Sequence, residues 1–118
     1  MTREEVFQYA AARYGTEPAY LWRKYPRYAV LRHDQGKWYG LVVNVSAKIL
    51  GLDATDAEQD VLVVKGDPEE IAILQQSRGF LPAYHMNKRH WITVLLADPQ
   101  AARQVPSLLA ESFALTSD

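Results

Sequence analysis

YAVLRHDQGKWYGLVVNV, residues 28–45, carries the clearest secondary-structure pattern in this chain. Two runs rich in strand-forming residues, Tyr28–His33 and Lys37–Val45, flank the segment Asp34-Gln35-Gly36. This polar segment favours a tight turn, because its glycine can adopt a positive φ at little cost. The stretch therefore predicts a β-hairpin, and tight turns between neighbouring strands predict an antiparallel sheet.

Two helices and a third strand are predicted around this hairpin. Thr2 and Glu5 form a capping box, in which each side chain accepts a hydrogen bond from a free backbone N–H group, and Gly15 can end the helix that follows. Beyond the hairpin, residues 59–65 (QDVLVVK) predict a strand. Asp67-Pro68 supplies the cap and the first-turn proline of a second helix.

Two more strands are predicted in the last third of the chain. Gly79 is expected to end the second helix, because glycine accepts the left-handed conformation in which helices often stop. Phe80–His85 predicts a short strand that Pro82 interrupts, and His90–Leu96 is the most convincing buried strand of the chain. Asn87-Lys88 is expected to form the turn between them.

The C-terminal residues complete the predicted fold. Asp98-Pro99 begins a short helical turn, and the chain restarts as a final helix near Pro106, because proline cannot sit deep inside a helix. The element order is then α-β-β-β-α-β-β-α. We expect residues 1–118 to form a single α+β domain with two layers, an antiparallel five-stranded sheet and helices on one face of it.

The composition fits a small soluble domain. The chain has 118 residues, of which 48% are hydrophobic and 23% are charged. No apolar run approaches the roughly 20 residues that cross a bilayer, and the N-terminus lacks the apolar core of a signal peptide. The absence of cysteine excludes disulfides and thiol chemistry. We expect a cytoplasmic monomer that does not contact membranes.

Charge is unevenly distributed along the chain, although the formal net charge is only −1. Residues 53–70 hold seven acidic residues and one lysine. Residues 18–52 hold six basic residues and one acid, and residues 71–97 hold three basic residues and no acid. The folded molecule could therefore have a basic side and an acidic side, or the segments could interleave and cancel.

Several segments resemble the MmcQ/YjbR family of small bacterial proteins, whose function is not established. They are YPRYAVLRHDQGKWYGLVVNV (25–45), KILGL (48–52), VVKGDPEEI (63–71) and RGFLPAYHMNKRHWITV (78–94). The resemblance covers roughly residues 1–115. It implies a compact α+β domain with an antiparallel sheet, often described as double-wing, DNA-binding-like or frataxin-like in shape.

A basic and aromatic group of residues is the candidate site, and nucleic acid, either DNA or RNA, is its candidate partner. HMNKRHW (85–91) packs two histidines, an asparagine, two cations and a tryptophan into seven positions. The cations would contact phosphates, the histidines and the asparagine would read polar groups, and the tryptophans would stack on bases. The candidate residues are Arg32, His33, Lys37, Trp38, His85, Asn87, Lys88, Arg89, His90 and Trp91.

The same residues also have structural readings. Trp38 and Trp91 could be core or cross-strand packing residues. His85 and His90 could hold the turn through hydrogen bonds, Asn87 could occupy a left-handed turn position, and Arg32 could pair with an acid across the hairpin.

No motif in the sequence supports an enzyme or a cofactor. There is no G-x-S-x-G elbow, no phosphate-binding glycine loop, and the spacing of the three histidines matches no metal-ligand rule. The acids Asp53, Asp56, Glu58 and Asp60 could suggest iron, but their spacing is more typical of a solvated loop. We therefore expect a non-enzymatic binding module without metal or cofactor.

A protein–protein adaptor is the alternative function. Tyr20–Arg27 (YLWRKYPR) combines tyrosine, tryptophan and arginine, the residue types enriched in binding hot spots. The structural reading of this loop is that Leu21 and Trp22 fold under the sheet and cover the core.

Overall fold

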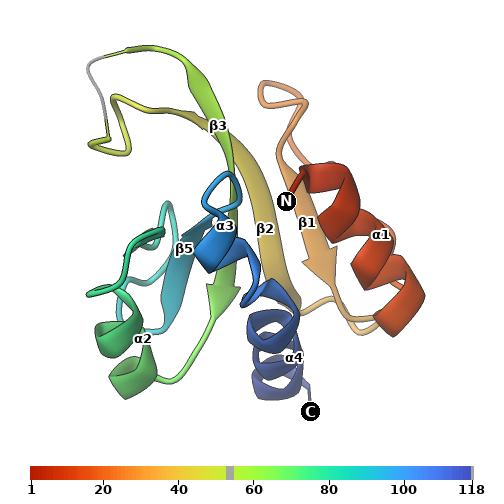
Figure 1. The fold of residues 1–118 in the computed structure, drawn as a ribbon. Helices are drawn as coiled ribbons and strands as arrows, with labels where there is room; N and C mark the ends of the chain where they lie inside the picture. The colour runs from red at the N-terminus through yellow and green to blue at the C-terminus, as the bar shows by residue number, and fades with distance from the viewer. Residues whose placement is uncertain (53–54, 118) are drawn as a thin grey trace.

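The structure of the chain is a computed structural model that describes residues 1–52 and 55–117. It confirms the α+β fold and the predicted order of elements, with the final helical region split in two just before Pro106, which lies in the first turn of the last helix (Figure 1). The elements are α1 (Arg3–Tyr14), β1 (Ala29–Arg32), β2 (Trp38–Ser46), β3 (Glu58–Lys65), α2 (Pro68–Leu74), β4 (Phe80–Pro82), β5 (Trp91–Leu95), α3 (Pro99–Ala102) and α4 (Val105–Thr116).

The five strands form one antiparallel sheet in the order β1-β2-β3-β5-β4. The predicted hairpin joins β1 and β2, and its turn contains Gly36 at a φ of 104°. The His33 N–H group donates to the carbonyl of Lys37 over 2.8 Å, which closes the hairpin. Figure 1 shows β2 and β3 as the long central strands, with α1, α3 and α4 in front of the sheet.

The local signals predicted for the helix starts are present. Thr2 and Glu5 make the reciprocal capping bonds of α1, and Gly15 ends that helix at a φ of 67°. The Asp67 carboxylate caps α2 by accepting from the N–H groups of Glu69 and Glu70. The predicted end of α2 at Gly79 was wrong. The helix ends at Leu74, and the residues between Leu74 and Gly79 form tight turns.

Alternating strand residues form two separate apolar clusters, one on each face of the sheet. The cluster on the helix-bearing face contains Val42, Leu62 and Val64 of the sheet together with Val6 of α1 and Leu109 of α4. The opposite face, here called the loop face, has Leu41, Val43, Val45, Val61 and Val63 at its centre. β2 and β3 are apolar on both faces, so both faces need a cover.

Aromatic side chains from loops, rather than helices, cover the loop face. Half-buried side chains packed on this face are Trp22, Trp38, Leu50, Tyr84, Met86, Trp91 and Leu95. Three of them come from two loop segments, Trp22 from the loop before β1 and Tyr84 and Met86 from the connection between β4 and β5. The second connection is longer than the predicted turn, because β4 ends at Pro82 and β5 begins at Trp91.

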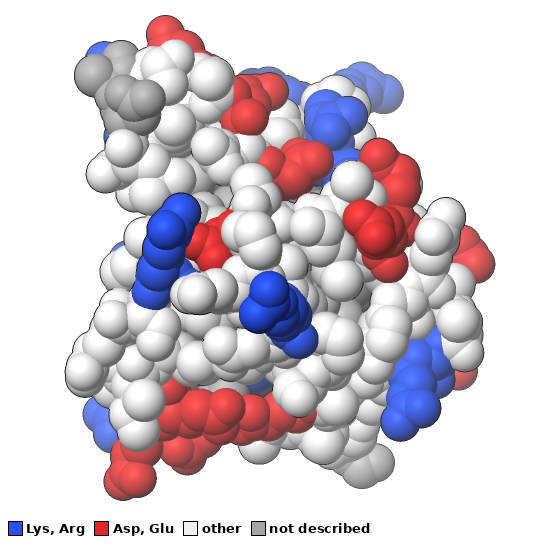
Figure 2. Space-filling model, in the orientation of Figure 1, with Lys and Arg blue, Asp and Glu red and all other residues white. Residues whose placement is uncertain are grey.

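Charges on the helix-bearing face do not form a basic surface. In Figure 2, which shows this face, acidic side chains gather at the lower left, where Figure 1 shows α2, whereas Lys and Arg are dispersed. None of the helices in the described part of the chain is long and apolar enough to cross a membrane.

Candidate nucleic-acid interface

An aromatic cavity of about 420 Å³ opens on the loop face. Its lining residues come from the loop before β1, from β2 and from the β4–β5 connection, and they are Trp22, Tyr25, Tyr28, Trp38, Leu41, His85 and Met86. Its volume lies in the range typical of small-molecule sites, about 300–1,000 Å³. We call it the aromatic cavity.

The rings of this cavity hold one another in defined orientations. Trp22 meets Tyr28 and Trp38 edge to face, with centroids 5.8 and 5.7 Å apart. Tyr25 stacks on Tyr28 at 4.7 Å and is itself 52% exposed. Burial, followed by the nearby Tyr84 hydroxyl, raises the pKa of Tyr28 to about 12, so this phenol is neutral at physiological pH. The cavity therefore has a preformed, uncharged aromatic wall with one solvent-exposed ring at its rim.

Two further hollows adjoin the aromatic cavity. One, of about 430 Å³, shares Tyr25 and Tyr28 with it and is lined by Lys24 and Arg27. The other, of about 400 Å³, shares His85 with it and is lined by Lys88. Cationic side chains therefore border the aromatic cavity on two sides.

Acidic residues reach the edge of this surface, so the charged segments interleave in part. Glu58 lines the hollow beside Arg27, where its carboxylate accepts two hydrogen bonds of 3.0 Å from the Asn44 amide. Asp60 accepts from Arg3 over 2.9 Å and from Arg27 over 3.5 Å. The basic and acidic segments therefore do not form two separate sides of the molecule.

Arg3 ties the loop before β1 to the sheet. Its guanidinium donates to the carbonyl of Arg27 over 2.6 Å and to the carboxylate of Asp60 on β3. The Arg3 side chain is 7% exposed, so this bond is shielded from water. The anchor holds one end of the segment that supplies Trp22 and Tyr25 to the aromatic cavity.

The β4–β5 connection is held by Asn87, though not in the predicted way. The Asn87 side-chain oxygen accepts from the N–H groups of Arg89 and His90, at 2.9 and 3.3 Å, and its carbonyl accepts from Trp91. Asn87 therefore caps one helical turn instead of adopting a left-handed conformation. His85 takes that conformation, with a φ of 63°.

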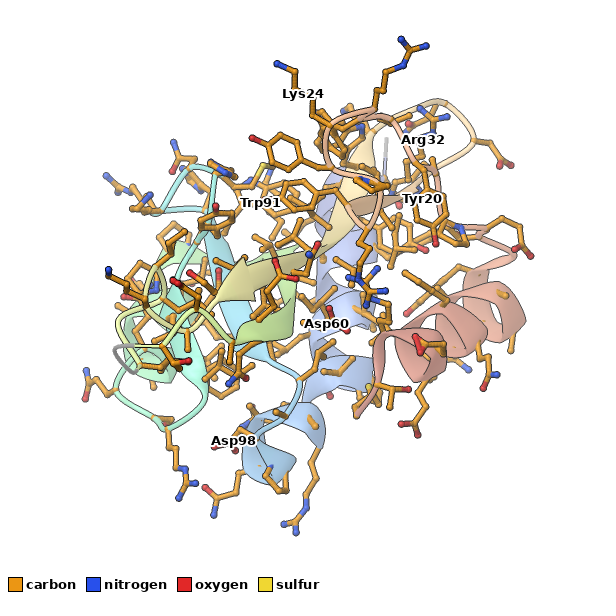
Figure 3. The ribbon with its side chains drawn as sticks, turned by 90° about the horizontal axis from the view of Figure 1, so that it is seen from above. Tyr20, Lys24, Arg32, Asp60, Trp91 and Asp98 are labelled. Carbon is orange, nitrogen blue, oxygen red and sulfur yellow. The ribbon has the colours of Figure 1, made fainter. Side chains whose placement is uncertain are left out.

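Most of the predicted site residues belong to the loop face or to the loops beside it. Trp38 and His85 line the aromatic cavity, Trp91 packs in the same apolar cluster, and Arg32 lies opposite Trp38 in the β1–β2 register. Figure 3 shows Lys24, Arg32 and Trp91 on the side of the strands away from α1 and α3. Exposed neighbours in the adjoining turns are Lys37, Asn87, Lys88, Arg89 and His90.

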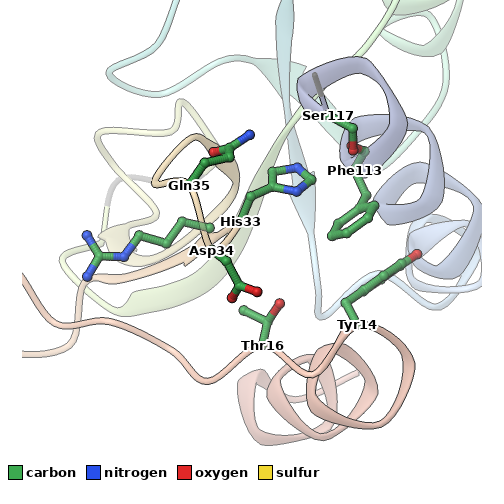
Figure 4. A pocket seen from close by; sticks show the side chains of 8 residues that line it. Tyr14, Thr16, His33, Asp34, Gln35, Phe113 and Ser117 are labelled. Atoms are coloured by element: carbon green, nitrogen blue, oxygen red, sulfur yellow. The ribbon is translucent and has the colours of Figure 1, made fainter.

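His33 does not belong to this group. Its ring lies 4.1 Å from Phe113 and 5.2 Å from Tyr39, and its Nε2 is 2.7 Å from the hydroxyl of Thr116. Because that hydroxyl donates to the carbonyl of Ser112, Nε2 is the donor to Thr116. Figure 4 shows His33 in a separate hollow of about 300 Å³, beside Tyr14 and Phe113. Arg32 also lines this hollow, at its edge in β1, so Arg32 and His33 share a hollow that does not include the other predicted site residues.

The structural readings of the candidate residues hold in part. Trp38 and Trp91 are half-buried packing residues of the loop face. Within the described residues, neither the His85 ring nor the His90 ring makes a hydrogen bond, and Arg32 has no ion pair. The same residues contain no group of three or more potential metal ligands. Asp53, one of the acids considered for iron, lies outside the described residues.

Sequence reasoning missed the central role of Trp22, Tyr25 and Tyr28. It treated Tyr20–Arg27 as a separate surface, whereas the structure joins that loop to the β4–β5 connection across one cavity. Trp22 packs against the sheet as the structural reading expected, but Leu21 is 45% exposed. The sequence feature that could have revealed this role is the continuous apolar run in β2. A strand that is apolar on both faces must be covered on both faces, and the aromatic segments were the available cover for the second face.

Comparisons with known proteins agree on one family. The family model described as YjbR matches residues 11–115. The uncharacterized protein YyaQ of Bacillus subtilis (strain 168) is 44% identical over 117 residues, which span 98% of each chain.

Solved structures show the same fold. A crystal structure of a Pseudomonas syringae protein, 44% identical, has a TM-score of 0.94 and covers 99% of this chain and 100% of its own. A Deinococcus radiodurans protein with a DUF419 domain is 23% identical, has a TM-score of 0.68, and covers 97% of this chain and 77% of its own. The second similarity concerns the fold alone.

Proposed function

This chain belongs to the YjbR family, and from that premise we propose that it is a non-enzymatic module that binds single-stranded nucleic acid through its loop face. The observation that carries this proposal is the aromatic cavity bordered on two sides by cationic hollows. Aromatic walls with cations beside them are the combination that proteins use to hold unpaired bases and their phosphates.

The aromatic cavity supports base stacking. Tyr25 is 52% exposed and already stacks on Tyr28, so a base entering the cavity can extend an existing pair of rings. Stacking of one base on an aromatic side chain contributes about 1–3 kcal/mol and depends little on sequence. Weak sequence preference follows from this mode of binding.

The concave shape favours unpaired bases over a duplex. A base inside a double helix has both of its faces covered by neighbouring base pairs, so it cannot enter a cavity without leaving the stack. The cavity lies between two loops, which a rigid duplex would have to displace. Single strands can present a base there at little cost.

Phosphate contacts would come from the side chains that border the aromatic cavity. Lys24 and Arg27 line one hollow and Lys88 lines the other, and all three are exposed. Arg89 is an exposed neighbour in the β4–β5 connection. With about three or four such contacts to a single strand, we expect the logarithm of the association constant to fall with the logarithm of the salt concentration, with a slope of about −2 to −3.

Fluorescence anisotropy with labelled single strands of DNA and of RNA tests this proposal. The variant Lys88→Ala with Arg89→Ala should bind at least several-fold more weakly, with a shallower salt slope. The matched control is Arg13→Ala with Arg103→Ala, which removes two exposed cations from helical segments on the other side of the sheet and should change little. The proposal fails if the wild type binds neither strand, or if both double variants bind equally well.

A protein partner is the second candidate, favoured by three exposed apolar side chains in one loop. Tyr20, Leu21 and Tyr25 are 56%, 45% and 52% exposed. Large exposed side chains of this kind are typical of binding hot spots. If Tyr20→Ser with Leu21→Ser leaves oligonucleotide affinity unchanged but abolishes capture of a protein partner, the adaptor function gains support.

A further inference from the structure

We propose that His85 positions a nucleotide at this interface, with the base in the aromatic cavity and the adjoining phosphate in the hollow beside Lys88. The inference rests on the proposed function and adds the unit of recognition, a base together with its own phosphate. Three independent features of His85 lead to it: its place between the two hollows, its backbone conformation and its unused hydrogen-bonding groups.

The first feature is position. Of the described residues that line the aromatic cavity and the Lys88 hollow, His85 alone lines both. Its ring lies 3.9 Å from that of Tyr84, tilted by 52°. A base in the first hollow and a phosphate in the second would therefore both be next to the imidazole.

The second feature is backbone strain. His85 is the one non-glycine residue with a positive φ, 63°, in the described part of the chain. Side chains other than glycine rarely adopt this conformation, and strained residues of this kind cluster at functional sites. A glycine would fit the same backbone without strain, so the presence of histidine calls for a role of the side chain.

The residues on both sides of His85 hold it in this conformation. The Tyr84 N–H group donates to the hydroxyl of Thr93 on β5 over 3.0 Å. Met86 packs in the apolar cluster of the loop face, and Asn87 caps the next turn. The fold therefore sustains the strained position, and ligand binding would not have to create it.

The third feature is chemistry. Within the described residues, the His85 ring and the Lys88 ammonium group make no hydrogen bond, and both residues are exposed. A neutral imidazole has one donor and one acceptor, so it can bond to the polar edge of a base or donate to a phosphate oxygen. Lys88 supplies the positive charge that a phosphate prefers.

Titration of the full chain with uridine 5′-monophosphate, uridine and inorganic phosphate tests the unit of recognition, and the fluorescence of Trp22 and Trp38 in the cavity wall reports binding. We expect the nucleotide to bind more tightly than either fragment, because only the nucleotide fills both hollows. Equal affinity for the nucleotide and for uridine would overturn the inference.

His85→Gly tests the residue itself through two readouts. Affinity for the nucleotide should fall about fivefold, as expected for the loss of one hydrogen bond. The melting temperature should rise by about 3 °C or more, because the strain is released. A histidine kept only for its contacts in the loop would instead lower the melting temperature when removed and leave the affinity unchanged, and unchanged affinity in this variant would overturn the inference. His90→Ala is the matched control in the same loop, and its affinity should stay near that of the wild type.

A comparison with oligonucleotides separates this inference from the proposed function. Oligonucleotide binding that needs Lys88 but not His85 would contradict the inference alone. Tighter binding of short oligo(dU) or oligo(U) than of the mononucleotide would support both. Equal affinity for the strand and the mononucleotide, with loss in His85→Gly, would support His85 as a nucleotide-positioning residue and contradict strand binding.

Discussion

Arg3 is the residue whose side chain connects the start of α1 to the sheet and to the loop of the aromatic cavity. Its Nη2 lies 2.9 Å from the carboxylate of Asp60, and its Nε has no hydrogen-bond partner among the described residues. A guanidinium this deeply buried depends on the one carboxylate that neutralises it. Because Arg27 also contacts Asp60, the base of the loop depends on this single carboxylate.

Asp60→Asn should be strongly destabilising, because it leaves the buried charge of Arg3 without a counter-charge. We expect the free energy of unfolding to fall by about 2–4 kcal/mol, as measured by urea denaturation. Asp56→Asn, which changes an exposed acid just before β3, is the control and should change stability by less than about 0.5 kcal/mol. Equal effects of the two substitutions would contradict the role given to Arg3.

Glu70 gives the protein a predicted pH dependence. Burial, followed by the hydrogen bond and charge of Glu111 and the charge of Asp67, raises the pKa of Glu70 above its usual 4.5. The folded state then binds the proton more tightly than the unfolded state, so this contribution to stability is present below pH 4.5 and is lost as pH rises through the raised pKa.

Glu111→Gln should remove part of this effect. At pH 7 the free energy of unfolding should increase by up to about 1 kcal/mol, because a repulsive pair of carboxylates is gone. The gain should shrink towards pH 4, where Glu70 is protonated in the wild type. Thermal denaturation across this pH range provides the measurement, with the exposed Glu17→Gln as control, and a gain independent of pH would contradict the assignment.

At the scale of elements, Gly79 shows how a short helix and an edge strand are packed together. It lies just before β4 at a φ of 93°, and its carbonyl accepts from the Leu95 N–H group of β5. A Cβ atom there would lie 2.6 Å from the Cβ of Ala101 in α3 and 3.0 Å from Cγ of Asp98. Both the conformation and the close approach require glycine.

Gly79→Ala should therefore cost more than a positive-φ glycine usually does. We expect a loss of about 2–4 kcal/mol, since strain from φ and from overpacking combine. Gly51→Ala is the matched control, because Gly51 has a φ of 76° but nothing within 4 Å of the position of a Cβ atom. Its loss should be about 1 kcal/mol. Chemical denaturation of both variants distinguishes the two contributions, and equal losses would contradict the packing argument.

The elements that could be predicted from sequence are those fixed by local chemistry. The hairpin around Gly36 and the starts of α1 and α2 follow from turn and capping residues a few positions apart. The end of α2 at Leu74 and the path of the β4–β5 connection could not be read this way. Both depend on packing against residues distant in the sequence.

The candidate site was predicted less completely than the fold, again for a physical reason. Residues close in sequence were grouped, although neighbours in a strand point to opposite faces. That error placed the His33 ring with the loop-face residues such as Trp38, whereas it packs under α4. The contribution of Trp22 and Tyr28 to the aromatic cavity depends on a loop folding over the sheet, which no local pattern specifies.

At the scale of the whole molecule, the two faces of the sheet have different covers. Helices cover one face, and their surface is mixed in charge with an acidic group near α2 (Figure 2). Aromatic loops cover the other face and leave hollows bordered by cations. A chain with a net charge of −1 can therefore still offer a local surface to an anionic ligand.

The most direct test of loop-face binding is the change in backbone amide NMR shifts on titration with an unlabelled single-stranded oligonucleotide. We predict that the largest changes fall in Tyr20–Arg27, at Trp38 and its neighbours in β2, and in residues 83–91, together with the indole N–H signals of Trp22 and Trp38. Changes confined to α1 and α4, or no changes at saturating oligonucleotide, would contradict the account.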